Sequence, residues 1–320
     1  MYVGLAIKLV LNMHDLNNER AEEIRRVPII YARKDGSWQV FEEAVAISGV
    51  MLKHWHFVYC VDLGLREGIN FCDYCRRFEA IRVPSKTAGT EFELISRCMG
   101  EDVHGFLRPE PTLRRESLVR FSWGLPLLNE QIAETFGMPT TFRVLQHSRN
   151  VREIPEEAPE EVRQAQMPYP RSYGDGVYGY VASLDLQHVG YSFTEEKNLD
   201  STQKEKRQRV AIQAFIPMLT GAMGGSMARA LPVADVLEVL LVSSSKPIPA
   251  PVHPIYPDYY ESSVALYKGV SKTMDCDVNV FVWSKESVVK EQTDEKFKLR
   301  KVEGPAHAFA EILKTIKSPG

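Results

Sequence analysis

The feature that most constrains this chain is a strict alternation close to its start. Residues 3 to 11 put large apolar side chains on one face and small or polar ones on the other: Val3, Leu5, Ile7, Leu9 and Leu11 against Gly4, Ala6, Lys8 and Val10. That period is typical of a half-buried β-strand. The second face is nearly flat, so another element can lie on it.

A hairpin is predicted next. Val27 to Tyr31 and Trp38 to Phe41 flank a turn that contains Asp35-Gly36. Asp-Gly between two apolar runs is a strong signal for a β-hairpin, because the turn needs residues that accept a positive φ.

A helix is predicted after Ser48, which is placed to cap it. Met51, Trp55 and Val58 fall at i, i+4 and i+7 and predict the buried stripe, with Lys53 and His56 on the opposite side. A strand, a hairpin and an amphipathic helix in this order predict an α+β fold.

The rest of the chain alternates regular and irregular stretches. Residues 62–100 show weak periodicity, as an insertion off a sheet would, and residues 153–171 hold four prolines within an acidic run. The second stretch predicts a long exposed loop or a protruding hairpin. The predicted strands are 117–123, 141–146, 177–186, 236–242 and 278–283, and the predicted helices are 204–220, 258–274 and 305–317.

Composition excludes several classes. The 320 residues are 44% hydrophobic and 25% charged, so a packed core is expected and disorder is not. No apolar run reaches the roughly 18 to 20 residues that a membrane helix needs, and the chain is expected to be soluble and cytoplasmic, without a membrane partner. The formal charge of -3 gives no hint of nucleic acid. Any such site must be local.

Five scattered cysteines argue against a secreted disulfide framework. Cys72-x-x-Cys75 with Cys60 and Cys98 could complete a four-thiolate zinc site, yet the spacing lacks the second Cys-x-x-Cys pair of zinc ribbons. Buried thiols in an insertion are the favoured interpretation, and metal binding stays open.

The glycine-rich segment 219–229 admits two interpretations. Successive glycines, Gly221, Gly224 and Gly225, let backbone N–H groups converge on a phosphate, and Arg229 could add a bidentate contact. No Lys-Ser/Thr follows the glycines and no strand precedes them, so nucleotide hydrolysis and a serine-hydrolase elbow are not supported. The alternative is a flexible connection from helix to strand.

The start of the predicted helix is a second candidate site. A helix start attracts phosphate through its free N–H groups, and Lys53 would reinforce this. His54 and His56 are either part of that site or structural histidines, and no His-Glu-x-x-His spacing suggests a metalloenzyme. Basic residues around Arg115 and around Arg149 are, by the same alternative, solvated surface.

Six segments, taken in order, resemble one family. They are Ser48-Gly-Val-Met-Leu-Lys-His-Trp-His56, Asp102-Val-His-Gly-Phe-Leu107, Arg114-Arg-Glu-Ser-Leu-Val119, Tyr178-Gly-Tyr180, the run from Ile216 to Arg229, and Pro247-Ile-Pro-Ala-Pro-Val-His253. The chain resembles, over nearly its whole length, the archaeal CRISPR-associated backbone protein of type I-A Cascade, in the DevR-like branch of the RAMP superfamily.

The resemblance implies a single domain over 1–320, a modified ferredoxin-like (RRM-like) palm with a finger insertion at 57–101 and a thumb hairpin within 143–180. It implies a non-catalytic subunit without a cofactor, which holds a CRISPR guide RNA by its backbone and presents the bases to a target DNA strand. The other implied partners are neighbouring copies of itself and further Cascade subunits. The residues expected at the RNA are Asn17, Ser48, Lys53, His54, His56, His104, Arg115, His147, Arg149, Gly221, Gly224, Gly225 and Arg229.

Two other functions remain open at this point. Relatives in the superfamily include metal-independent endonucleases that cleave CRISPR-repeat RNA, and His54, His56 or His104 could act as general bases. The DevR-like name is also attached to transcriptional autoregulation, although no helix-turn-helix spacing supports it.

Overall fold

The computed structural model describes residues 1–16, 18–20, 23–32, 35–146, 159–160, 169–224, 231–285 and 288–316. A mixed sheet forms its centre, with the order β10-β11-β1-β14-β15-β17-β16. These strands are β1 (Tyr2–His14), β10 (Thr140–Gln146), β11 (Tyr169–Asp185), β14 (Val233–Ser244), β15 (Val278–Ser284), β16 (Gln292–Thr293) and β17 (Phe297–Lys301). Neighbours are antiparallel except β15 and β17, so the expected α+β class is confirmed.

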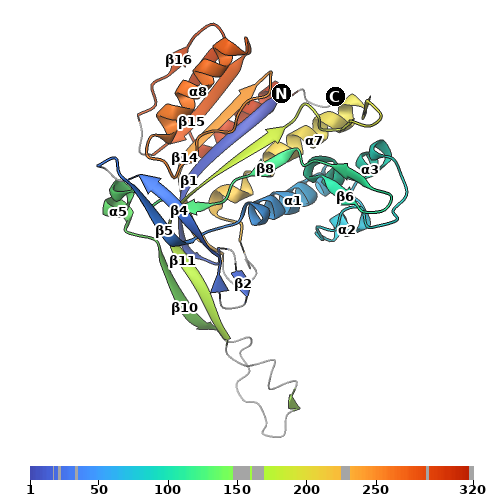
Figure 1. The fold of residues 1–320 in the computed structure, drawn as a ribbon. Coiled ribbons are helices and arrows are strands. Elements are labelled where there is room, and N and C mark those ends of the chain that lie inside the picture. The colour runs from blue at the N-terminus through green and yellow to red at the C-terminus, as the bar shows by residue number, and fades with distance from the viewer. Residues whose placement is uncertain are drawn as a thin grey trace.

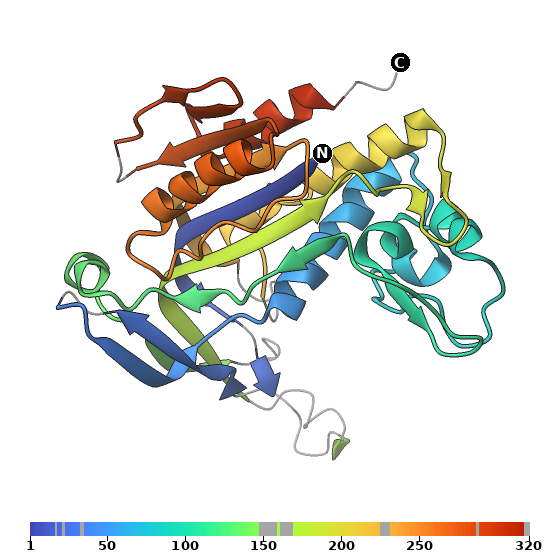
Figure 2. The same ribbon diagram turned by 45° about the horizontal axis from the view of Figure 1, so that its top comes forward.

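Helices cover both faces of this sheet (Figures 1 and 2). On one face lie α1 (Gly49–Arg66), α7 (Ser201–Gln213), the 3₁₀ turn η1 (Pro217–Thr220) and α9 (Pro305–Thr315). On the other face lies α8 (Tyr259–Thr273), which packs on β15 and β17. The last two predicted strands and the last two predicted helices therefore coincide with β14, β15, α8 and α9.

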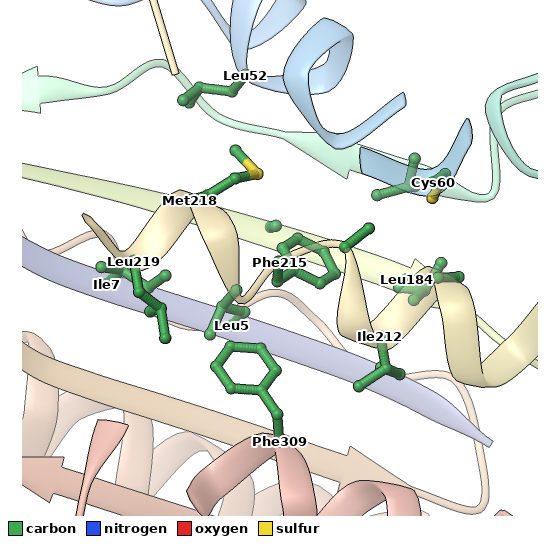
Figure 3. Packing of buried hydrophobic residues seen from close by; sticks show 14 of the residues in the cluster. Leu5, Ile7, Leu52, Cys60, Leu184, Ile212, Phe215, Met218, Leu219 and Phe309 are labelled. Carbon is green, nitrogen blue, oxygen red and sulfur yellow. The ribbon is translucent and has the colours of Figure 1, made fainter. Parts of the chain in front are cut away.

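Strand β1 is buried on both faces. Leu5 and Ile7 enter the main core with Phe215 and Phe309 (Figure 3). Leu9 belongs to the same core. Each such aliphatic side chain stabilises the fold by about 2 kcal/mol. The sequence predicted a strand with one buried face, and the second burial comes from tertiary packing by the segment before α8 and by α8 itself.

The flat second face of β1 is what admits that layer. A Cβ on Gly4 would lie 2.9 Å from Val242 Cγ1 and 3.0 Å from Pro251 Cδ. The large residues of β1 therefore pack into the main core on one face, and the small residues let the second layer approach closely on the other.

The predicted hairpin is confirmed as β4 (Arg26–Ala32) paired with β5 (Trp38–Val45), beside the short β2 (Asn18–Arg20) and β3 (Glu23–Ile24). Ser48 caps α1 as predicted, since its Oγ accepts from Met51 N at 3.2 Å. The predicted face of α1 is wrong: Leu52, His56 and Phe57 are buried, whereas Met51, Trp55 and Val58 are half-buried at the edge of the core.

Residues 67–118 form a lobe with a small core of its own, beside α1 (Figures 1 and 2). It holds α2 (Asp73–Arg76), α3 (Glu91–Arg97), α4 (Met99–His104), β6 (Phe106–Arg108) and β7 (Leu113–Arg115). The sequence predicted an irregular insertion here. Its helices are at most seven residues long and too short to show a 3.6-residue period.

A buried charge network ties the lobe to the sheet layer. Asp102 accepts hydrogen bonds from Arg115 Nη2 at 2.8 Å and from Arg207 Nη1 at 2.9 Å, and Arg115 Nη1 also donates to Glu91 Oε1 at 2.6 Å. All four side chains are at most 2% exposed. Two cations and two anions balance, which is the condition under which ionised groups tolerate burial.

The four remaining strands are short. β8 (Val119–Phe121) and β9 (Leu125–Pro126) pair with β11, and β12 (Tyr191–Ser192) pairs with β13 (Lys197–Asn198). Helix α5 (Glu130–Phe136) was not predicted. Where the sequence predicted one helix over 204–220, α7 ends at Gln213 and η1 follows.

Strands β10 and β11 form a hairpin that extends beyond the sheet (Figure 1). Phe142 stacks on Tyr173 with ring centroids 5.9 Å apart, and Arg171 Nη2 donates to Asp15 Oδ2 at 3.2 Å. The predicted loop or protruding hairpin at 153–171 lies almost entirely outside the described residues, and the described strands β10 and β11 flank it. Among the described residues, no helix has the length and apolarity to cross a membrane.

Removing the central carboxylate of the network should unfold the lobe. Asp102→Ala leaves Arg115 and Arg207 buried without their shared partner, and we expect the free energy of unfolding to fall by about 3–5 kcal/mol. The measurement is urea denaturation followed by circular dichroism. Asp62→Ala is the matched control, because it breaks an exposed pair with Arg66 and should cost under about 1 kcal/mol. Equal losses for the two variants would contradict the assignment.

Candidate functional site

A groove opens at the start of α1, with a volume of about 360 Å³. Its walls come from the β3–β4 corner, the first turn of α1, and the chain from β7 to β9. The lining residues are Arg25, Ser48, Gly49, Val50, Lys53, Glu116, Ser117, Val119, Arg120, Phe121 and Trp123. Two of the predicted RNA-binding residues, Ser48 and Lys53, therefore lie in one groove.

The start of α1 is fixed closely against β8 and β9. Ile47 and Gly124 exchange backbone hydrogen bonds of 2.9 and 2.8 Å. A Cβ on Gly49 would lie 2.7 Å from the Phe121 carbonyl oxygen, so only glycine allows this approach. Val50, the next residue, is 79% exposed. The first turn of the helix thus faces the groove and solvent, where its N–H end favours negative charge.

Positive charge dominates the groove. Burial, together with the nearby charges of Arg82 and Arg120 and against that of Glu116, lowers the pKa of Lys53 to about 8. The Arg25 guanidinium lies 5.7 Å from the centroid of the half-exposed Trp123 ring. A groove with converging cations and an aromatic face suits a phosphate-linked chain of bases.

His54 is half-buried next to this groove, in an edge-on contact with Trp55 at 6.0 Å between ring centroids. Burial, and then the charge of Arg82, lower the pKa of His54. His54 is therefore expected to be neutral at physiological pH, so it offers a hydrogen bond rather than a charge.

His56 and His104 lie in the interior, and the prediction that they contact RNA is corrected. His56 is 0% and His104 2% exposed, and their rings share a hydrogen bond of 3.0 Å between Nδ1 and Nε2. His56 Nε2 donates to the Ala211 carbonyl at 2.9 Å. Burial lowers the pKa of His56 to about 4 and that of His104 well below its usual value. Both join α1 and α4 to the core as neutral groups.

Arg115 is corrected for the same reason. Its guanidinium is 0% exposed, and all its described contacts are with Glu91, Asp102, two backbone carbonyls of residues 188 and 191, and the Phe193 ring. A charge that is already neutralised in the interior cannot serve a phosphate outside.

Hydrogen bonds join the glycine-rich segment to α1 and to His14 at the end of β1. Trp55 Nε1 donates to the Gly224 carbonyl and Tyr59 Oη to the Ala222 carbonyl, both at 2.7 Å. Gly221 N–H donates to the Met218 carbonyl at 3.2 Å, so this group is used within the turn. Gly221 has φ +70° and Gly224 φ +136°, conformations that favour glycine. Asn17, His147, Arg149, Gly225 and Arg229 lie outside the described residues.

Sequence reasoning did not include Arg25, Arg82, Arg120 or Trp123 among the site residues. The sequence carried one signal, the basic and aromatic residues of Arg120-Phe-Ser-Trp123 directly after the Arg114-Arg115 pair. Arg25 and Arg82 come from distant segments, and only the fold brings them to the start of α1.

Two groups of side chains have the chemistry of metal ligands. Cys72, Cys75 and Cys98 converge in the lobe, and His56, Cys60 and His104 converge in the core, each with ligand atoms within 4.8 Å of one another. The four-thiolate zinc site that the sequence left open is therefore wrong in one member. Cys60 does not join the other three cysteines, because its Sγ lies 3.7 Å from His56 Nδ1 in the core.

Comparison with known proteins gives consistent matches. A family described as CRISPR-associated negative auto-regulator DevR/Csa2 matches residues 5–264. A CRISPR-associated protein Cas7/Cst2/DevR of Methanocaldococcus jannaschii is 33% identical over 291 residues, or 85% of this chain and 90% of that protein. A protein of the same description from Thermoproteus tenax is 31% identical over 246 residues, or 72% of each.

Two solved structures share the fold. One chain of a CRISPR RNA-guided surveillance complex matches with a TM-score of 0.51 at 9% identity, over 98% of this chain and 99% of that one. A chain of such a complex in a pre-nicking state matches with a TM-score of 0.56 at 10% identity, over 99% and 100%.

The glycine-rich segment generates a stability prediction. In Gly224→Ala, the Cβ would lie 2.7 Å from His14 Cε1 at φ +136°, and we expect the free energy of unfolding to fall by about 1–3 kcal/mol. Gly269→Ala in α8 is the control, because a Cβ there meets nothing within 4 Å and should stabilise the helix by about 1 kcal/mol. Chemical denaturation measures both, and a neutral Gly224→Ala would show that the segment adapts freely.

Proposed function

The chain belongs to the DevR/Csa2 family of CRISPR-associated proteins, and from this premise we propose that it binds a CRISPR guide RNA along its phosphate backbone. In this proposal it acts as one of several copies in an RNA-guided surveillance complex. The observation that carries the proposal is the groove at the start of α1, in which Lys53, Arg25 and Arg120 face one space with the Trp123 ring.

The chemistry of the groove fits a backbone reader. Lysine and arginine side chains gain affinity by neutralising phosphates, independently of sequence, and the open first turn of α1 adds N–H groups of the same polarity. The exposed part of the Trp123 ring offers a stacking surface that accepts any base. Base pairing is then left to read the target strand.

The wider architecture is assigned in the same proposal. The sheet with its helices would be the palm, in a ferredoxin-like arrangement. The predicted finger at 57–101 would include the end of α1 and most of the lobe. The hairpin of β10 and β11, which overlaps the predicted range 143–180, would be the thumb that kinks the guide. His147 and Arg149 fall between its strands, and Asn17, Gly225 and Arg229 complete the proposed RNA contacts.

Contacts between copies need an exposed surface. The β4–β5 hairpin carries three apolar side chains that are largely exposed: Ile30 at 57%, Trp38 at 64% and Val40 at 54%. Such a patch is typical of a protein interface. We assign it to a neighbouring copy along the guide, with target DNA and other Cascade subunits as the remaining partners.

The alternative activities make different demands. An endonuclease would need a general base at the RNA, and His56 and His104 are too buried for that role, which leaves His54. An autoregulator, which the family is named for, would need to bind duplex DNA. The proposal of a non-catalytic subunit therefore makes distinct predictions for RNA cleavage and for competition by DNA.

The test is filter binding of the purified chain to single-stranded RNA at two salt concentrations. Three phosphate contacts from Lys53, Arg25 and Arg120 should give a slope of about -2 or steeper in log affinity against log salt. Duplex DNA should compete poorly, and CRISPR-repeat RNA incubated without metal should stay intact. An affinity independent of salt would refute backbone binding, whereas cleavage or strong DNA competition would favour the alternatives.

Lys53 gives the proposal a pH signature. Its pKa of about 8 means that the ammonium is lost at lower pH than in an ordinary lysine, so charge is present below pH 8 and absent above it. We expect RNA affinity to fall by up to roughly tenfold from one unit below to one unit above that value.

Two variants separate this effect from general pH dependence. Lys53→Arg keeps its charge and should show a flat profile, while Lys53→Ala should bind weakly at both pH values and reduce the salt slope by about 0.7. Circular dichroism should show an unchanged fold. A wild-type profile that matches Lys53→Arg would exclude Lys53 from the contact.

A further inference from the structure

We propose that Cys72, Cys75 and Cys98 bind a structural zinc ion in the lobe, with Glu101 as the fourth ligand. The three Sγ atoms lie within 4.8 Å of one another. A tetrahedral zinc with Zn–S distances of about 2.3 Å needs sulfur atoms about 3.8 Å apart, so a small contraction completes the site.

The backbone presents the three thiols from two rigid segments. Cys72 is the cap of α2 and Cys75 its third residue, the arrangement in which a Cys-x-x-Cys pair turns both sulfurs to one side. Cys98 ends α3 and begins α4. Met99 N–H donates to the Asn70 carbonyl at 3.0 Å and so holds the two segments together.

Gly100 leaves the space that the sulfurs occupy. A Cβ there would lie 2.8 Å from Cys75 Sγ and 3.0 Å from Phe57 Cε2. Cys75 and Cys98 are both 0% exposed, while Cys72 is half-buried. The site is therefore closed by protein on most sides and reached from solvent past Cys72.

Glu101 supplies an independent observation. Its side chain is 1% exposed, its carboxyl interacts with Cys72, and Oε2 has no hydrogen-bond partner among the described residues. The nearest cation, Arg97 Nε, is 3.8 Å away. A buried carboxylate oxygen that makes a long ion pair but no hydrogen bond is costly, and a metal ion beside the thiols would satisfy it.

Charge balance is compatible with zinc. Three thiolates and a carboxylate exceed the charge of the ion by two, and the guanidinium of Arg82, which interacts with all three cysteines and with Glu101, offsets part of the excess. Binding would release the thiol protons to solvent. A Cys72–Cys75 disulfide is the competing chemistry, but it gives no role to Cys98 or to the Glu101 oxygen.

The first measurement is zinc content after dialysis against a weak chelator, quantified by mass spectrometry on the folded full-length chain. We expect about one zinc per wild-type chain and a loss of most of it in Cys75→Ser and Cys98→Ser. Cys60→Ser is the matched control, because this buried thiol faces His56 instead. Zinc content equal in wild type and Cys75→Ser overturns the proposal, as does loss confined to Cys60→Ser.

A second measurement does not depend on the folding of variants. Cobalt added to the wild-type chain after strong chelation should produce thiolate-to-cobalt charge-transfer bands and the visible bands of a tetrahedral site, and zinc should displace them. Glu101→Gln should keep the thiolate bands but lower zinc affinity at least tenfold. Absence of these bands overturns the proposal.

Alkylation distinguishes zinc from a disulfide. Thiols of the zinc-bound chain should resist iodoacetamide until a strong chelator is added, without any reductant. Thiols that react only after reduction would identify the disulfide and overturn the proposal.

Discussion

The carboxylate of Asp102 is the point on which the lobe, and with it the groove, depends. It accepts from Arg115 in β7 and from Arg207 in α7, so one buried anion joins the inserted segment to the helical layer under the sheet. Leu118 N–H donates to the Val103 carbonyl, one residue beyond Asp102. The chain that continues through Arg120 to Trp123, one wall of the groove, is therefore placed by an interaction in the interior.

This arrangement explains how a chain with a formal charge of -3 can present a cationic surface. Arg115 and Arg207 are buried in ion pairs with Glu91 and Asp102, so neither these cations nor these anions contribute charge to the surface. The groove cations Arg25, Lys53 and Arg120 come from three separate segments and converge at the start of α1. Affinity for phosphate depends on such local density, not on the sum over the chain.

The sequence predicted correctly those elements that depend on residues close together in the chain. Three features follow from side chains close in sequence: the alternation of β1, the Asp-Gly hairpin and the Ser48 cap. The face of α1 could not be predicted in this way, because apolar residues lie on more than half of its surface and the lobe decides which of them is covered. His56 and Arg115 were misassigned for one shared reason: their burial depends on segments 24 to 155 residues away, such as those that hold Glu91, His104 and Ala211.

The two ends of strand β11 differ in how they are paired. Its C-terminal half is paired on both sides within the sheet, whereas its N-terminal end is paired with β10 alone. The change occurs at Gly174 and Gly176, where the pairing with β1 shifts register and Gly176 has φ +155°. The root of the hairpin is held by the sheet and by the Asp15–Arg171 pair, and the two glycines mark the place where β11 leaves β1. A force applied to the described end of β10–β11 is therefore carried by backbone hydrogen bonds into β1, whose side chains are buried on both faces of the sheet.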